Sequence, residues 1–339
     1  MLFNLTDSLI GYSSSQRHKV IVGVTNLLIG YYEGKNLLMI SDGFYDHFSK
    51  VISDERALLS LRHLHSYTTY VYNVNKRFNV VLDGACGSDE ILIDYFYNTS
   101  SIQPVKIIGE NANDVEFYAV VTQIIKHVDK ENLAYTLIHG GGYTTGGRLE
   151  QYQNNNELSL CIVDSDIKFP GAQKGATCGQ IETVYDSKNK FVLLIVIKVH
   201  EIENLIPPKF IVDRAKKESK RIAQRFLENG NEKYLRWYDL KNGISTVDIE
   251  DPLYKAFAIK LYNQFYDSKP ETFDRHVSQC KRKKEKIFPE LANNLIKKYL
   301  WLPIEKQSIY PIYFKDEWRE IADNFYDYAC SREKDPIYI

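Results

Sequence analysis

The sequence has little cysteine and no pattern that would use it. Five cysteines are scattered over 339 residues, none of them in a CxxC pair, and the eight histidines form no HExxH motif. An odd, dispersed set of cysteines argues against a disulfide framework and against a thiolate zinc site. We therefore expect a reducing, cytoplasmic environment. The cysteines are Cys86, Cys161, Cys178, Cys280 and Cys330.

Long apolar runs and a surplus of charge of one sign are also lacking. The longest apolar run, 191–199, contains Lys198 and has the length of a strand, so we expect no membrane-spanning segment. Residues 1–19 lack the basic and apolar regions of a secretion signal. With 43 Lys and Arg against 44 Asp and Glu, the net charge is −1, which excludes a polycationic packaging protein. Any binding of nucleic acid must come from local patches.

What is present is the composition of a globular protein, with 44% apolar and 26% charged residues. The length predicts two or three domains. We divide the chain into an N-terminal domain of unknown role at 1–100, an α/β domain at 105–207 and a mostly helical region at 208–339. The break at 100–104 (SSIQP) is typical of a linker.

The middle stretch alternates strand and helix patterns. Continuous apolar strands separated by helices predict a mainly parallel sheet that is covered on both faces. The fold class is therefore α/β. We predict strands within 105–110, 133–142, 158–166 and 191–204, and helices at 114–127 and from 144 onward.

The flanking stretches give weaker patterns. Apolar residues alternate at 18–32, an alternation typical of a strand, and 41–78 suits helices, so the first stretch is expected to be α/β or α+β. The third stretch carries helical patterns at 211–228 and 316–331.

Two acidic clusters follow two of the predicted strands. Glu110 ends the first strand, with Asp114 four residues later, and Asp164 and Asp166 end the third. Ligands of open α/β sheets collect at the carboxyl ends of the strands, where both clusters would meet. Carboxylates so close together raise one another's pKa unless a cation offsets their charge. Oxygen ligands without Cys or His favour Mg²⁺ or Mn²⁺. The plainer interpretation of each acid is a turn or a helix cap.

These segments resemble a known family. IIGENANDVEFY (107–118) resembles the first motif of TOPRIM domains, in which E-G-x-x-D follows an apolar strand, and CIVDSDIKFP (161–170) resembles the second, a strand ending in D-x-D. KVHEIENLIPP (198–208) and LRWYDLKNGIS (235–245) are similar to segments of TOPRIM nucleases of the overcoming-lysogenization-defect type and their anti-phage relatives, including the PARIS nuclease subunit. The resemblance covers about a third of the chain and implies a TOPRIM-like sheet.

The resemblance also implies roles for single residues. Glu110 becomes the strand-end acid that binds metal or acts as base, and Asp114 supports the first motif as a further candidate metal ligand. Asp164 and Asp166 become metal ligands, and Glu203 a candidate ligand of a second ion. Lys241 is the candidate cation that stabilises the transition state.

One position departs from the motif, because Asn111 stands where the family has Gly. Asn is the non-glycine residue that best tolerates a left-handed backbone, so we expect the turn to survive.

Two basic runs stand out against the neutral total. A charge run is most often a solvated face, but beside a metal site such runs become contacts to a phosphate backbone. The candidate nucleic-acid-binding residues are Lys216, Lys217, Lys220, Arg221, Lys281, Arg282, Lys283 and Lys284.

The leading hypothesis is a Mg²⁺- or Mn²⁺-dependent nuclease that cleaves DNA or a structured RNA. The resemblance implies a role in anti-phage defence and control by an ABC/SMC-type ATPase. Because the chain has no Walker motif, that ATPase would be a separate subunit. The N-terminal stretch would sense a trigger, bind a partner or form a homodimer. The alternatives are a nucleotide-sugar glycosyltransferase, in which D-x-D also holds a metal, and a catalytically degenerate TOPRIM sensor or scaffold.

Overall fold

The computed structural model describes residues 1–66, 74–84, 87–228, 230–266 and 270–332. The chain forms two compact units. The first consists of Met1–Cys161, Val184–Leu194 and Arg319–Ile339, and the second of Ile162–Thr183 and Ile195–Trp318. The three-part division at 1–100, 105–207 and 208–339 stays a prediction from the sequence.

The first unit contains a four-stranded parallel sheet near the N-terminus. Its strands are β1 (Leu2–Leu5), β2 (Leu37–Met39), β3 (Arg77–Val81) and β4 (Glu90–Leu92), in the order β2-β1-β3-β4. Phe3 pairs with Phe78 in the register of β1 and β3, and both side chains are buried. The expectation of an α/β first stretch is confirmed.

Three helices belong to the same part of the chain as this sheet, and for one of them the sequence pattern was ambiguous between strand and helix. They are α1 (Arg17–Tyr32), α2 (Asp42–Phe48) and α3 (Glu55–Ser66), and α1 packs on α3. The strand-like alternation at 18–32 was misleading, because the segment is helix α1. Its buried residues include Val20, Val24, Leu27 and Leu28, which have helical spacing, so the run satisfies both periods and burial selects the helix.

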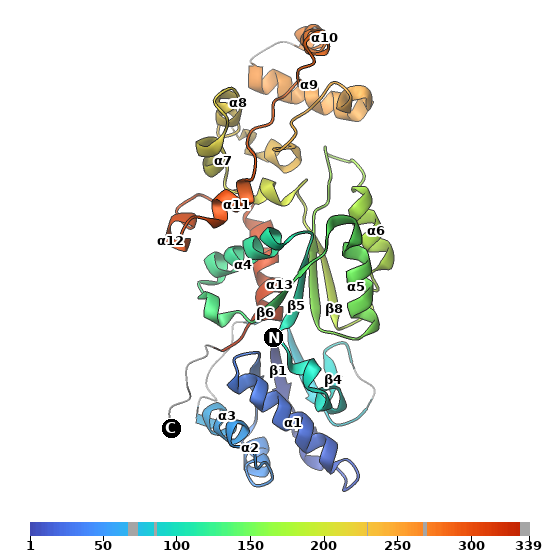
Figure 1. Cartoon of the computed structure of the whole chain (residues 1–339), viewed down its shortest axis with the longest axis vertical. Coiled ribbons are helices and arrows are strands. Elements are labelled where there is room, and N and C mark those ends of the chain that lie inside the picture. Colours follow the sequence, from blue (N-terminus) through green and yellow to red (C-terminus); the bar gives the residue numbers. More distant parts are fainter. Residues whose placement is uncertain (67–73, 85–86, 229, 267–269, 333–339) are drawn as a thin grey trace. The chain divides into compact units, whose positions relative to one another are not determined.

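A second four-stranded sheet corresponds to the predicted parallel layer. Its strands are β5 (Val105–Gly109), β6 (Tyr135–His139), β7 (Ser159–Val163) and β8 (Val192–Val196), in the order β6-β5-β7-β8. Strand β5 is parallel to both β6 and β7. Helices α4 (Ala112–Lys126) and α5 (Thr145–Asn154) contact β5, and Figure 1 shows them on opposite sides of it. The α/β class and the parallel pairing are confirmed.

Strand β8 is shorter than predicted. The sequence indicated a strand through 191–204, but β8 ends at Val196 and a 3-10 turn occupies Ile202–Leu205. The chain leaves the sheet after Ile197, whose N–H donates to the carbonyl of Val163, so the rest of the apolar run is buried in a loop.

The second unit is helical apart from its strand ends. Its helices are α6 (Ala176–Val184), α7 (Pro208–Arg214), α8 (Lys220–Arg225), α9 (Pro252–Tyr266), α10 (Phe273–Lys283), α11 (Leu295–Leu300) and α12 (Ile304–Gln307). The helix predicted over 211–228 is broken between α7 and α8, because Ala215 is extended and the N–H of Lys216 donates to the carbonyl of Leu291. The helix predicted at 316–331 is α13 (Lys315–Ala329).

Two expectations from the sequence concerned the cysteines and membrane-spanning segments. Cys161, Cys178, Cys280 and Cys330 are buried, and Cys86 lies outside the described residues. Among the helices of the described ranges, none is both long enough and apolar enough to span a bilayer.

Candidate functional site

The residues of the two predicted acidic motifs belong to different units. Glu110 and Asp114 lie in the first unit, at the end of β5 and the start of α4, whereas Asp164 and Asp166 follow β7 in the second. Strands β5 and β7 are parallel neighbours, which agrees with the predicted parallel sheet; that they are adjacent was not predicted. Glu203 and Lys241, which form an ion pair, belong to the second unit as well.

The first motif forms a helix cap. The side chain of Asn111 accepts from the N–H groups of Asn113 and Asp114, at 2.9 and 3.3 Å, and Asp114 Oδ2 accepts from the Asn111 N–H at 3.0 Å. This reciprocal pair is a capping box, and Asp114 is buried in it. The tolerance of Asn111 for a left-handed backbone is not used here, because its φ is −139° and its ψ is 171°. The cap requires an extended residue at this position, and Asn supplies its acceptor.

The second motif forms a tightly fastened loop. Asp164 Oδ1 accepts from the Ile202 N–H at 3.0 Å, the Asp166 N–H donates to the His200 carbonyl at 2.9 Å, and Ser165 Oγ donates to the Val199 carbonyl at 2.5 Å. These three bonds tie 164–166 to 199–202, so the D-x-D segment and the segment after β8 lie side by side within the second unit.

Asp166 has an unusual backbone. Its φ of 54° places it in the left-handed region, which is uncommon for residues other than glycine, although aspartate adopts it more readily than most. A Cβ added at Gly175 would lie 2.4 Å from Cβ of Asp166, so glycine there leaves the space that the aspartate fills. The Gly175 N–H also donates to the carbonyl of Ser165. The position of Asp166 is therefore fixed from two sides, by the segment at His200 and by Gly175.

A short turn brings a third segment to the same place. The Glu201 N–H donates to Asn204 Oδ1 at 2.8 Å, which starts the 3-10 turn Ile202–Leu205. Asn204 is buried, and its Nδ2 donates to the carbonyls of Leu235 and Tyr238 at 2.6 and 2.8 Å. One amide thus holds the segment 235–241 against the turn.

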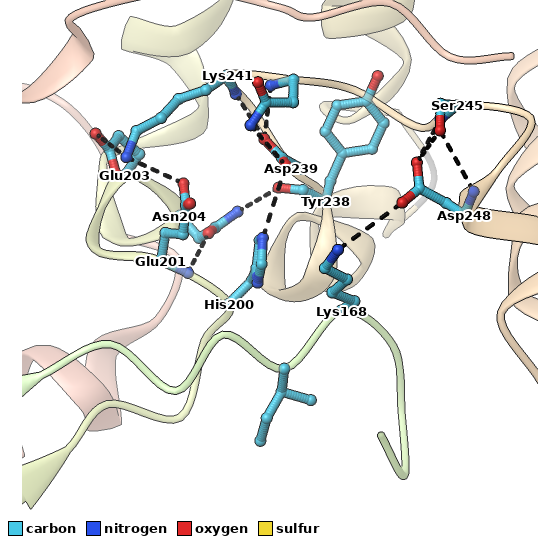
Figure 2. Close-up of polar contacts among 12 residues, drawn as sticks. Lys168, His200, Glu201, Glu203, Asn204, Tyr238, Asp239, Lys241, Ser245 and Asp248 are labelled. Atoms are coloured by element: carbon cyan, nitrogen blue, oxygen red, sulfur yellow. Dashed lines mark hydrogen bonds and ion pairs between the residues drawn. The ribbon is translucent and has the colours of Figure 1, made fainter. Parts of the chain in front are cut away.

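Lys241 lies between two buried carboxylates, as Figure 2 shows. Its Nζ is 3.0 Å from Glu203 Oε1 and 3.2 Å from Glu201 Oε2. Burial alone would lower the pKa of the Lys241 ammonium, but the two glutamates outweigh it and raise the pKa above its ordinary value. Burial raises the pKa of Glu201, which Lys241 lowers in part. In the structure Lys241 is thus the counter-ion of Glu201 and Glu203.

Asp239 and His200 complete the cluster (Figure 2). Asp239 Oδ1 accepts from the N–H groups of Asn242 and Lys241, at 2.6 and 3.1 Å. Burial would raise the pKa of Asp239, but the His200 imidazole and the donors of Asn242 lower it below its usual range. His200 Nε2 lies 4.0 Å from Asp239 Oδ2, so the two groups are in electrostatic contact but beyond hydrogen-bonding distance.

The cluster also contains buried polar atoms without hydrogen bonds. His200 is only 3% exposed, and neither of its ring nitrogens has a hydrogen-bond partner among the described residues. The same holds for Glu203 Oε2. Buried polar groups are almost always satisfied, so such atoms call for an explanation.

The part of this cluster suited to a metal is a set that the sequence did not predict. His200, Glu201 and Asp239 each offer one ligand atom, and these atoms lie within 4.8 Å of one another. Glu201 and His200 stand beside Glu203 in HEIEN, and Asp239 stands two residues before Lys241 in YDLK. The signal was therefore present in the two segments from which only Glu203 and Lys241 were taken.

The basic runs are placed on the surface of the second unit. Lys281, Arg282 and Lys283 form the exposed last turn of α10, and Lys284 is its left-handed cap. Lys217, Lys220 and Arg221 are exposed at α8, whereas Lys216 is half-buried in an ion pair with Glu290. Seven of the eight candidate residues are thus exposed to solvent.

Comparisons of the chain with protein families, with curated proteins and with solved structures found no match.

Proposed function

We propose that this protein is a divalent-metal-dependent nuclease that hydrolyses phosphodiester bonds of DNA or RNA, with Mg²⁺ or Mn²⁺ as its cofactor and a TOPRIM-like catalytic sheet. The observation that carries the proposal is the fastening of the D-x-D loop to the segment after β8. The bonds from Ile202 to Asp164 and from Asp166 to His200 gather both aspartates with Glu201 and Glu203 in one unit.

Carboxylate oxygens are the donors that a hard divalent ion prefers. Asp164 and Asp166 are the proposed ligands, and Glu203 is a further carboxylate whose second oxygen is buried without a hydrogen bond among the described residues. When bound, such an ion stabilises negative charge on a phosphoryl oxygen and lowers the pKa of water.

The chain's own groups supply the other roles. Glu110 is the proposed base, and this role rests on the sequence resemblance alone. Lys241 carries a firmly held positive charge that offsets charge developing on the phosphate. The exposed cations of α8 and α10 would contact the phosphate backbone without reading sequence.

Defence against phage, a separate ABC/SMC-type ATPase and a homodimer belong to the same proposal. They rest on the sequence resemblance alone.

The decisive experiment compares cleavage by the wild-type chain and by Asp164→Asn. Asparagine keeps an acceptor for the Ile202 N–H but removes the charge. Plasmid, linear duplex and tRNA are incubated with each protein and Mg²⁺ or Mn²⁺. The matched control is Asp213→Asn, on the exposed surface of α7. We expect cleavage by the wild type and the control, and loss of at least about 100-fold in Asp164→Asn.

Equal cleavage by Asp164→Asn and the wild type would remove the assignment, as would the absence of cleavage of all three substrates. Consumption of a sugar nucleotide instead would identify the glycosyltransferase alternative. Binding of nucleic acid without turnover would identify the degenerate sensor or scaffold.

A further inference from the structure

His200 is the most unusual polar residue of the second unit. It is 3% exposed, and among the described residues neither ring nitrogen forms a hydrogen bond. Its backbone is held from two sides, since its N–H donates to the Arg236 carbonyl and its carbonyl accepts from Asp166. The imidazole is thus fixed in a buried position and directed at carboxylates.

The spacing of the neighbouring groups suits an ion between them. A separation of 4.0 Å between His200 Nε2 and Asp239 Oδ2 is too long for a hydrogen bond. Two ligands that each lie about 2.1 Å from one metal are separated by roughly 3 to 4.2 Å. Glu201 contributes a third ligand atom within 4.8 Å of the other two. Three protein ligands with an open position are typical of catalytic metal sites.

The chemistry of the ligands selects the ion. Carboxylates alone suit Mg²⁺, whereas imidazole binds Mg²⁺ poorly and suits first-row transition ions. We propose that His200, Glu201 and Asp239 form a second metal site, which takes Mn²⁺ or Zn²⁺ in preference to Mg²⁺. Neither Asp164 nor Asp166 is a ligand of this second site. Its occupancy does not depend on the proposed nuclease activity.

Lys241 is the internal competitor of this ion. Its Nζ contacts Oε2 of Glu201, and Glu201 is the residue that would supply the third ligand. A bound ion would therefore compete with the ammonium for Glu201, and the second contact of the ammonium, Glu203 at 3.0 Å, can retain it. The ammonium then stays beside the site as a positive charge available to a phosphate.

The test measures ion binding directly on the full chain. Mn²⁺ is titrated and the free ion is followed by electron paramagnetic resonance, while Zn²⁺ is measured by competition with a chromophoric chelator. The variants are His200→Gln, Glu201→Gln and Asp239→Asn, with His18→Gln and Asp213→Asn as exposed controls. We expect the three ligand variants to lose one bound ion or to bind it at least about tenfold more weakly, and Mg²⁺ to compete poorly.

Thermal unfolding followed by circular dichroism separates loss of ligand from loss of fold. Mn²⁺ or Zn²⁺ should raise the midpoint of the wild type and the controls, but not that of a folded ligand variant. Equal Mn²⁺ and Zn²⁺ binding by wild type and variants would overturn the site, as would a wild type that binds neither ion. Ion binding without cleavage would refute the nuclease and keep the site. If cleavage needs Asp164 and His200→Gln binds the ions as the wild type does, the second metal site is refuted and the nuclease is kept.

Discussion

Replacing Lys241 by methionine should destabilise the second unit through the carboxylates that it leaves behind. Methionine keeps most of the apolar stem and removes the ammonium that contacts Glu201 and Glu203. The side chains of Glu203 and Glu201 are only 10% and 16% exposed, so water can replace the lost cation only in part.

The magnitude follows from this unequal burial. Removing one partner of a fully buried pair costs about 3–5 kcal/mol, and an exposed pair contributes about 0–1 kcal/mol. Because Lys241 itself is 42% exposed, solvent screening reduces its effect. We expect a loss of about 1–3 kcal/mol in the free energy of unfolding at neutral pH.

Lys255 offers a matched control. It is 41% exposed, like Lys241, but its partner Asp274 is 78% exposed, so Lys255→Met should cost less than about 1 kcal/mol. Both variants are measured by urea denaturation followed by tryptophan fluorescence. An equal effect of the two substitutions would refute the argument from buried carboxylates.

The pH dependence has a definite sign. The pKa of Glu201 is already raised by burial, and loss of Lys241 raises it further. A carboxyl whose pKa is higher in the folded state destabilises that state as pH rises through the folded value. The cost of Lys241→Met should therefore be larger at about pH 8 than at about pH 5, and Glu203→Gln added to it should restore part of the stability.

Further substitutions test three single features. Asn111→Ala should cost about 1 kcal/mol through loss of the α4 cap and Asn111→Gly only a few tenths, whereas exposed Asn113→Ala should cost little, all measured by chemical denaturation. Gly175→Ala should destabilise the second unit in the same assay by about 1–3 kcal/mol, because the new methyl would overlap Asp166. Burial raises the pKa of Asp327, so the wild type loses stability as pH rises through that pKa. Asp327→Asn should abolish this loss in melting curves from about pH 4 to pH 7, and an unchanged slope would contradict it.

The parallel character of the second sheet could be predicted because the alternation of strands and helices is visible in local patterns, whereas the strand order β6-β5-β7-β8 was not predicted. Buried runs such as VKIIG and SLCIV, with helical segments between them, are typical of parallel strands that are covered by helices. Helix α1 was missed because valine and leucine at 18–32 fit both periods, and only tertiary burial distinguishes them.

The polar cluster of the second unit could be predicted only in part, because its members gather through one buried amide. Asn204 donates hydrogen bonds to the carbonyls of Leu235 and Tyr238, and no pattern in the sequence predicts these contacts. Without it Asp239 is an acid in a turn. With it, Asp239 faces His200, a residue 39 positions earlier that burial deprives of water and of hydrogen bonds to the described residues. Motif matching found Glu203 and Lys241 because their segments resembled known ones, whereas the histidine acquires its chemistry only from the packing around it.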